Sequence, residues 1–100
     1  MVQKVIMTIG LSSDPGKESE LSRWYREVHI PEARRLMPGI AGVTFYENLK
    51  PDKDSPCILA IWEFESEDAV KAVENNQARN FTPGPKYEIK LFNWFRRVDL

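Results

Sequence analysis

The single histidine of the chain, His29, is the side chain best suited to proton transfer. It lies four residues after Tyr25 in a helical pattern, at the border between the apolar and polar faces. An imidazole titrates near neutral pH and could exchange a proton with a small molecule bound beside the helix. A structural role is the alternative, in which His29 caps the helix or bonds a backbone carbonyl where Pro31 interrupts the pattern.

Tyrosines and strand carboxylates are the next candidates. Tyr25, Tyr46 and Tyr87 each carry a phenol that could orient a carbonyl or hydroxyl group of a ligand, although aromatic residues in a small domain also serve as core. Glu47 and Glu63 lie in predicted strands, and a carboxylate beside an apolar cleft would have a raised pKa. Exposure to solvent is the simpler interpretation of both acids.

The counts of metal-binding side chains and charges exclude several classes of site. One histidine and one cysteine, Cys57, cannot build a two-histidine metal site, an internal disulfide or a multi-thiolate zinc site within one subunit. We interpret Cys57 as a small hydrophobic residue in a reducing compartment and expect neither a metal nor a nucleotide cofactor. With 14 Lys and Arg against 15 Asp and Glu, no basic field favours nucleic acid.

Membrane insertion and secretion are not expected from the sequence. The apolar run at 1–10 is interrupted by Gln3, Lys4 and Thr8, which is unlike the apolar region of a signal peptide. No window approaches the roughly 18 consecutive apolar residues that a spanning helix needs. We therefore expect a cytoplasmic protein with no membrane partner.

Six segments carry the periodicity of strands or helices. Strands are predicted at 2–9, 40–49, 57–64 and 87–98, the first ending at Gly10. One helix is predicted from near Lys17 to a stop at Pro38-Gly39, with a kink or a fresh first turn at Pro31, and another from Ser66 to about Asn76. The order βαββαβ predicts an α+β, ferredoxin-like domain over residues 1–100, with a four-stranded antiparallel sheet and two helices on one face.

Both faces of that sheet are apolar in the last two strands. In the last strand we expect Tyr87, Ile89, Leu91 and Phe95 to point to one side and Phe92 and Trp94 to the other. Two helices cover only one face, so the other would expose a large apolar surface in a monomer. We therefore predict a homodimer that packs through the open sheet face.

A cleft is predicted between the sheet and the first helix, open at the end where His29 lies. The helix brings Trp24, Tyr25 and Leu36 over strands that carry Tyr46 and Trp62. These aromatic and aliphatic side chains would form the wall of a site for a small hydrophobic organic ligand.

Several segments of the sequence, taken in their order along the chain, resemble the EthD-like branch of the dimeric α+β barrel superfamily. The similar segments are 24–31 (WYREVHIP), 37–40 (MPGI), 43–46 (VTFY), 58–64 (ILAIWEF) and 66–69 (SEDA), in the family's order. The combination W-x4-H-x-P-x6-PG is the most specific part of the resemblance. It implies a dimer in which each sheet and its helices enclose a cleft for a small, often aromatic molecule.

The resemblance implies a cofactor-free enzyme of monooxygenase, cyclase, isomerase or dehydratase type, with His29 as acid/base. It also implies that Tyr46 lies where the sheet faces the first helix, as a second catalytic residue. The cysteine that similar lactone isomerases use would fall near Ala60 or Ile61, and Cys57 lies earlier. Two alternatives remain: a non-catalytic ligand-binding or accessory dimer, and a haem-binding protein with His29 as axial ligand.

Overall fold

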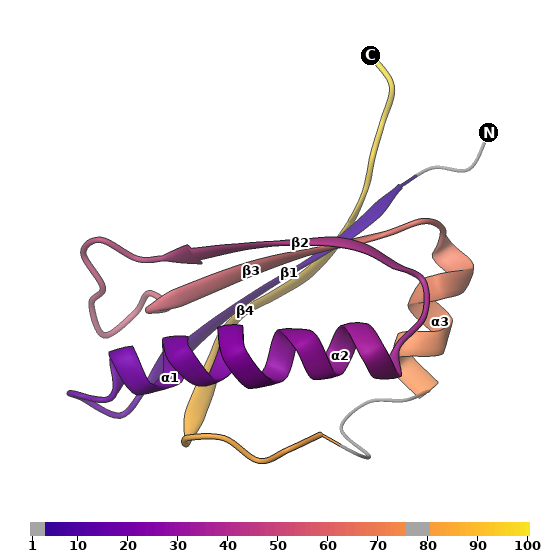
Figure 1. The fold of residues 1–100 in the computed structure, drawn as a ribbon. Coiled ribbons are helices and arrows are strands. Elements are labelled where there is room, and N and C mark those ends of the chain that lie inside the picture. The colour runs from indigo at the N-terminus through magenta and orange to yellow at the C-terminus, as the bar shows by residue number, and fades with distance from the viewer. Residues whose placement is uncertain (1–3, 76–80) are drawn as a thin grey trace.

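A computed structural model describes residues 4–75 and 81–100 of the chain (Figure 1). The strands are β1 (Val5–Ser13), β2 (Ile40–Glu47), β3 (Ile58–Phe64) and β4 (Tyr87–Arg96). The helices are α1 (Glu18–Trp24), the π-helical η1 (Tyr25–His29), α2 (Ile30–Leu36) and α3 (Glu67–Asn75). The predicted ends at Val2 and Asn76 lie outside the described residues.

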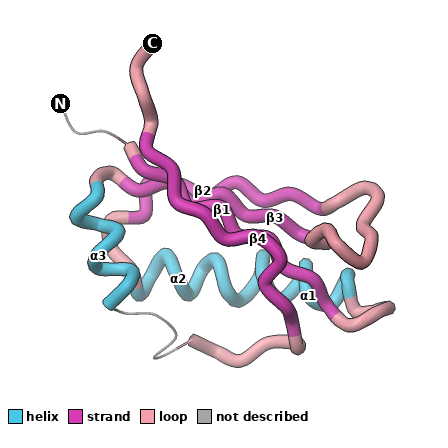
Figure 2. Tube along the Cα trace, turned by 180° about the vertical axis from the view of Figure 1, so that it is seen from behind, coloured by secondary structure: helices cyan, strands magenta, loops and turns pink. Residues whose placement is uncertain are grey.

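The strands form one antiparallel sheet in the order β2-β3-β1-β4. Both helical segments lie on the same side of it, with α1, η1 and α2 running along the sheet and α3 at one end (Figures 1 and 2). The predicted α+β, ferredoxin-like fold is therefore confirmed. No helix in the described part of the chain is long and apolar enough to cross a membrane.

The first helical segment continues through Pro31 because the chain inserts one π-helical turn before it. The Ile30 N–H donates to the Tyr25 carbonyl five residues back, whereas an α-helix would bond four residues back. Pro31 then lies in the first turn of α2, where a backbone N–H would have no acceptor within that helix, so its absence removes no hydrogen bond from α2. The predicted stop is confirmed, since the chain leaves the helix at Met37 and Gly39 adopts a left-handed φ of 102°.

The prediction that the first strand ends at Gly10 was wrong. β1 extends to Ser13, and Gly10 lies inside the sheet. A Cβ at this position would lie 2.8 Å from Pro56 Cγ and 3.1 Å from Leu91 Cβ. The glycine is therefore required by close packing rather than by a turn.

The predicted facing of β4 was wrong for two residues because the strand contains a β-bulge. Gly10 pairs with Leu91 but Leu11 pairs with Ile89, so Lys90 is the extra residue. The insertion reverses the alternation, and Tyr87 and Ile89 join Phe92 and Trp94 on the helix-facing side. Leu91 and Phe95 lie on the open face. A one-residue shift of this kind moves every later side chain to the opposite face.

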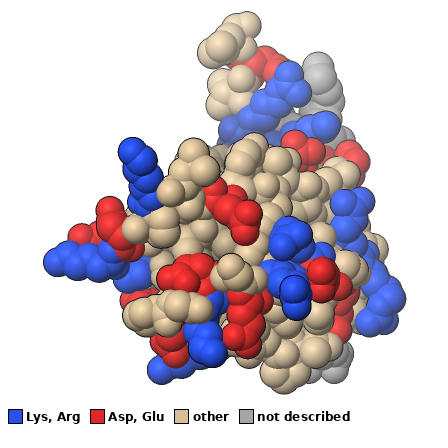
Figure 3. Space-filling view, turned by 60° about the vertical axis from the view of Figure 1, so that its left-hand side comes forward, with Lys and Arg blue, Asp and Glu red and all other residues tan. Residues whose placement is uncertain are grey.

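The core lies between the sheet and the helices. Its most deeply buried large side chains are Leu21 and Tyr25 from the helix and Trp62 and Phe64 from β3. Cys57 is buried at the same layer, which agrees with its interpretation as a small hydrophobic residue. On the molecular face shown in Figure 3, the described Lys, Arg, Asp and Glu side chains are intermixed and form no continuous patch of one sign.

Candidate functional site

Two adjoining cavities lie between the first helical segment and the sheet. The inner cavity has a volume of about 130 Å³ and reaches Tyr25, Trp62 and Phe64. The outer cavity has a volume of about 420 Å³ and extends toward Trp24, residues 82–84 and Tyr87. Both are lined by Ile9, His29, Phe81 and Phe92. The histidine therefore stands where the two cavities meet, as the cleft prediction requires.

The His29 side chain is surrounded by aromatic rings. The imidazole centroid lies 4.8 Å from the Tyr25 ring and 5.2 Å from the Trp24 ring, on which it stacks. Phe81 lies at 5.2 Å and Trp62 meets the imidazole edge-on at 6.0 Å. This environment is apolar on several sides, and the His29 side chain is half-buried in it.

Burial lowers the pKa of His29 below its ordinary value, and the nearby Glu32 carboxylate opposes that shift in part. The imidazole is therefore neutral at neutral pH and can accept a proton. Its Nδ1 is buried and has no hydrogen-bond partner among the described residues. Nδ1 therefore makes none of the helix-capping or carbonyl contacts that the structural alternative would use at this atom.

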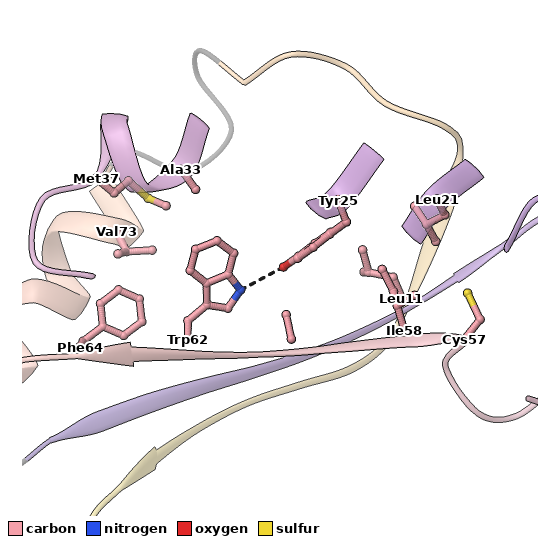
Figure 4. Close-up of a cluster of buried hydrophobic side chains, with 11 residues drawn as sticks. Leu11, Leu21, Tyr25, Ala33, Met37, Cys57, Ile58, Trp62, Phe64 and Val73 are labelled. Carbon is pink, nitrogen blue, oxygen red and sulfur yellow. Dashed lines mark hydrogen bonds between the residues drawn. The ribbon is translucent and has the colours of Figure 1, made fainter. Parts of the chain in front are cut away.

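Tyr25 and Trp62 are joined by a buried hydrogen bond on the wall of the inner cavity. Trp62 Nε1 donates to Tyr25 Oη over 2.9 Å, and the two side chains point toward each other from helix and sheet (Figure 4). Burial raises the pKa of Tyr25 above its ordinary value. The hydrogen bond from Trp62 opposes this increase but is the smaller effect. The phenol therefore remains protonated at neutral pH.

A segment between α3 and β4, residues 81–86, lies along the outer cavity. The Glu32 carboxylate accepts hydrogen bonds from the backbone N–H and the hydroxyl of Thr82. Gly84 lies directly against the Trp24 ring, because a Cβ there would approach Trp24 Cε2 to 2.1 Å. Sequence analysis did not assign Phe81, Thr82 or Gly84 to the site. The only signal was a turn-rich stretch, which carries no information about what it covers.

Four of the six predicted site residues line the cavities: Trp24, Tyr25, His29 and Trp62. Leu36 does not, and Met37 lines the inner cavity in its place. The π-helical turn explains this correction, because one extra residue rotates the buried stripe forward by one position.

The prediction that Tyr46 faces the first helix was wrong. Tyr46 pairs with Leu59 on the open face of the sheet and is 49% exposed. Its neighbour Phe45 pairs with the buried Ala60 and stacks on Tyr25 at 5.5 Å. Alternation along β2 places consecutive side chains on opposite faces, so the helix-facing aromatic is Phe45.

The two strand carboxylates do not line the cavities. Glu47 accepts a hydrogen bond from the buried Ser22 hydroxyl at 2.7 Å, and Arg26 donates to the same hydroxyl. This contact joins the first helical segment to β2. Glu63 pairs with Ile6 and lies half-buried on the open face. In the described part of the chain, no group of three or more His, Cys, Asp or Glu side chains could hold a metal ion.

Several solved structures share this arrangement along nearly the whole chain. An inferred monooxygenase from Shewanella loihica PV-4 superposes with a TM-score of 0.65 at 9% identity, covering 100% of this chain and 99% of that one. An EthD-like protein from Ralstonia eutropha JMP134 gives 0.59 at 16% identity, covering 89% and 91%. The chain has the fold of EthD-like proteins. The resemblance seen in the sequence is thus confirmed at the level of the fold.

A haem-degrading protein from Mycobacterium tuberculosis also shares the fold, with a TM-score of 0.62 at 20% identity over 100% of this chain and 98% of that one. The same mycobacterial protein with two haems bound in its active site gives 0.59 at 19% identity, covering 96% and 98%. No protein-family model and no curated protein sequence matches the chain. One fold of this kind serves several chemistries, so function has to be argued from the site.

Proposed function

We propose that this EthD-like chain is a cofactor-independent enzyme that binds a small hydrophobic, aromatic and oxygenated compound and transforms it by proton transfer through His29. The observation that carries the proposal is the position of His29, which lines both apolar cavities at the place where they meet. A neutral imidazole beside an apolar cavity has a lone pair that can accept a proton from a bound ligand.

The size and lining of the cavities support a ligand of one or two fused rings. The outer cavity, at about 420 Å³, falls within the range of about 300–1,000 Å³ that is typical of small-molecule sites. Aromatic residues on its walls favour a flat molecule that stacks between them. Relatives of the same fold that include an inferred monooxygenase and a haem-degrading protein are in accord with an oxygenated ligand.

Exchange of carbon-bound hydrogen for deuterium tests this function without knowledge of the natural substrate. The probe is 2-tetralone, a bicyclic ketone that has acidic benzylic C–H bonds between its benzene ring and its carbonyl. In D2O the protein should accelerate deuterium incorporation at that carbon, and His29→Gln should lower the rate by roughly 100-fold, the usual scale of general acid/base catalysis. Thr44→Ser, on the open face of β2, is the matched control.

Because the chain has one histidine, its ring signals also report binding without ambiguity in NMR spectra. Saturable shifts of these signals with 2-tetralone, but no deuterium exchange, would favour the non-catalytic ligand-binding alternative. Absence of both would contradict the proposed function. Mass spectrometry of small molecules released from the purified protein then identifies the natural ligand class.

Haem is a second candidate, because the imidazole of His29 lines both cavities and could serve as an axial ligand, and because a haem-degrading protein shares the fold. The residues that line the cavities suit haem less well than they suit a small uncharged ligand. No Lys or Arg is among the described residues that line either cavity, so the propionates would have no cation there. A Soret band that forms on addition of haem and is lost in His29→Gln would favour this candidate.

The proposed enzyme is a homodimer that packs through the open face of the sheet. That face carries Ile6, Leu59, Ile61 and Leu91, all half-buried, together with Phe95, which is 52% exposed. No helix of the described chain covers it (Figure 2). At about 25 cal/mol per Å² of apolar surface, a second copy would stabilise such a face substantially.

A further inference from the structure

In the hydrogen bond between Trp62 and Tyr25, the indole of Trp62 can only be the donor. An indole N–H can donate but has no acceptor, so the Tyr25 oxygen must accept over the 2.9 Å that separates the two atoms. The phenol keeps its own proton, which must point elsewhere. The orientation of the bond is visible in Figure 4, where the two side chains meet head-on beneath the helix.

That phenolic proton has no acceptor of its own. The bond from Trp62 is the one in which the Tyr25 hydroxyl takes part among the described residues. Tyr25 is only 2% exposed, so water does not compensate from the surface. A buried hydroxyl proton that lacks an acceptor is costly, which is why such groups generally have a partner in the working state of a protein.

We propose that the Tyr25 hydroxyl donates a hydrogen bond to a carbonyl or phenolic oxygen of the ligand in the inner cavity, and that Trp62 is a positioning residue that directs it there. The proposal rests on the proposed function and narrows it to ligands that carry such an oxygen. The ring of Tyr25 lines the inner cavity together with His29, 4.8 Å away between centroids.

His29 and Tyr25 would have separate roles in an enolisation. His29 takes a proton from the carbon beside the carbonyl, and the electron pair of that C–H bond becomes the double bond of an enolate. The carbonyl oxygen gains the negative charge, and the Tyr25 O–H stabilises it by a hydrogen bond. Return of the proton from His29 to carbon completes an exchange or an isomerisation without oxidant or reductant.

The two other tyrosines do not fit this role. Tyr87 stacks on Trp24 at the outer cavity and is 47% exposed, so water satisfies its hydroxyl. Tyr46 lies on the open face of the sheet, away from His29.

The test compares 2-tetralone with tetralin, which has the same ring system without the carbonyl. Wild-type protein should prefer the ketone, and Tyr25→Phe should lower the ketone-to-tetralin affinity ratio about tenfold, the effect of one lost hydrogen bond. The infrared carbonyl band of bound 2-tetralone should lie at lower wavenumber in the wild type than in Tyr25→Phe. Deuterium exchange should fall roughly 100-fold in the same variant.

Trp62 is tested by a double-mutant comparison. Trp62→Phe should lower the ketone-to-tetralin ratio, and the Tyr25→Phe, Trp62→Phe double variant should match Tyr25→Phe alone, because Trp62 acts through Tyr25. If the two effects multiply instead, the positioning role is overturned. Should Trp62→Phe fail to fold, the ketone's carbonyl band in wild type and Tyr25→Phe decides the assignment of Tyr25.

The outcomes separate this inference from the function on which it rests. An unchanged carbonyl band and affinity ratio in Tyr25→Phe would overturn the role of Tyr25, while deuterium exchange that still depends on His29 would leave the proposed function standing. A retained carbonyl shift without exchange would support Tyr25 as a ligand contact and contradict catalysis by His29. Failure to bind either probe would overturn both.

Discussion

Glu32 and Thr82, fifty residues apart in the chain, are joined by two hydrogen bonds, because one carboxylate accepts both the backbone N–H and the hydroxyl of Thr82. This contact fastens residues 81–86 beside the outer cavity, with Phe81 against His29. The polar contact is exposed, whereas the aromatic contact that it supports belongs to the site. A surface carboxylate thus contributes to the shape of the cavity.

The hydrogen bonds from Thr82 lower the pKa of Glu32 below the ordinary value of 4.5, and the bond from the Thr82 hydroxyl has the larger effect. A lowered carboxyl pKa means that the contact is fully present above pH 4.5 and is lost as the pH falls through the lower pKa of the folded protein. The protection factor of the Thr82 amide, which compares its hydrogen exchange with the intrinsic rate at the same pH, should fall in that range. Glu32→Gln should remove this pH dependence, and a Thr82 amide insensitive to both changes would contradict the contact.

The burial of neutral His29 predicts a distinct pH dependence of stability. Because its pKa is lowered in the folded state, the unfolded chain binds the proton first, and the free energy of unfolding should decrease as the pH falls from 6.5 toward the folded pKa. His29→Gln should lack this decrease and cost at most about 1 kcal/mol at pH 7. Urea unfolding followed at several pH values measures both. Equal pH profiles for the two proteins would show that His29 is not buried in its neutral form.

Gly84→Ala should displace residues 81–86 from Trp24. The added Cβ would meet the indole ring at 2.1 Å, so one of the two must move. Overpacking of this kind costs about 1–3 kcal/mol, and the variant should also bind 2-tetralone more weakly. Chemical denaturation and NMR titration measure the two effects. Lys86→Ala, at an exposed position of the same segment that lines neither cavity, is the control and should change stability and binding less.

A charge on the open sheet face should split the proposed dimer. Phe95→Glu places a carboxylate on this apolar face, in the edge strand β4, and a buried unpaired charge opposes association. Sedimentation or light scattering at micromolar concentration should report a dimer for the wild type and a monomer for the variant. Leu49→Glu, in a loop position that is 94% exposed, should leave the mass unchanged. A monomeric wild-type protein would contradict the prediction.

The order of strands and helices followed from the sequence alone, because apolar periodicity and turn residues act locally. The strand runs at 40–49 and 57–64, the Pro38-Gly39 stop and the helix after Ser66 all lie within a few residues of the observed elements. The sequence also predicted that Trp24 and Tyr25 lie around His29. That prediction succeeded because Trp24, Tyr25 and His29 share one short helical stretch.

Beyond that stretch the sequence predicted Trp62, and the tertiary structure decided which other side chains enter the cavities. The π-helical turn at Tyr25–His29 replaced Leu36 by Met37, and the bulge at Lys90 moved Tyr87 and Ile89 to the helix side. The π-helical turn and the bulge each add one residue to a regular element. The local sequence pattern does not reveal such an insertion, yet it changes the direction of every later side chain in the element. The contact between Glu32 and Thr82 joins distant segments, and such pairings depend on how the whole chain packs.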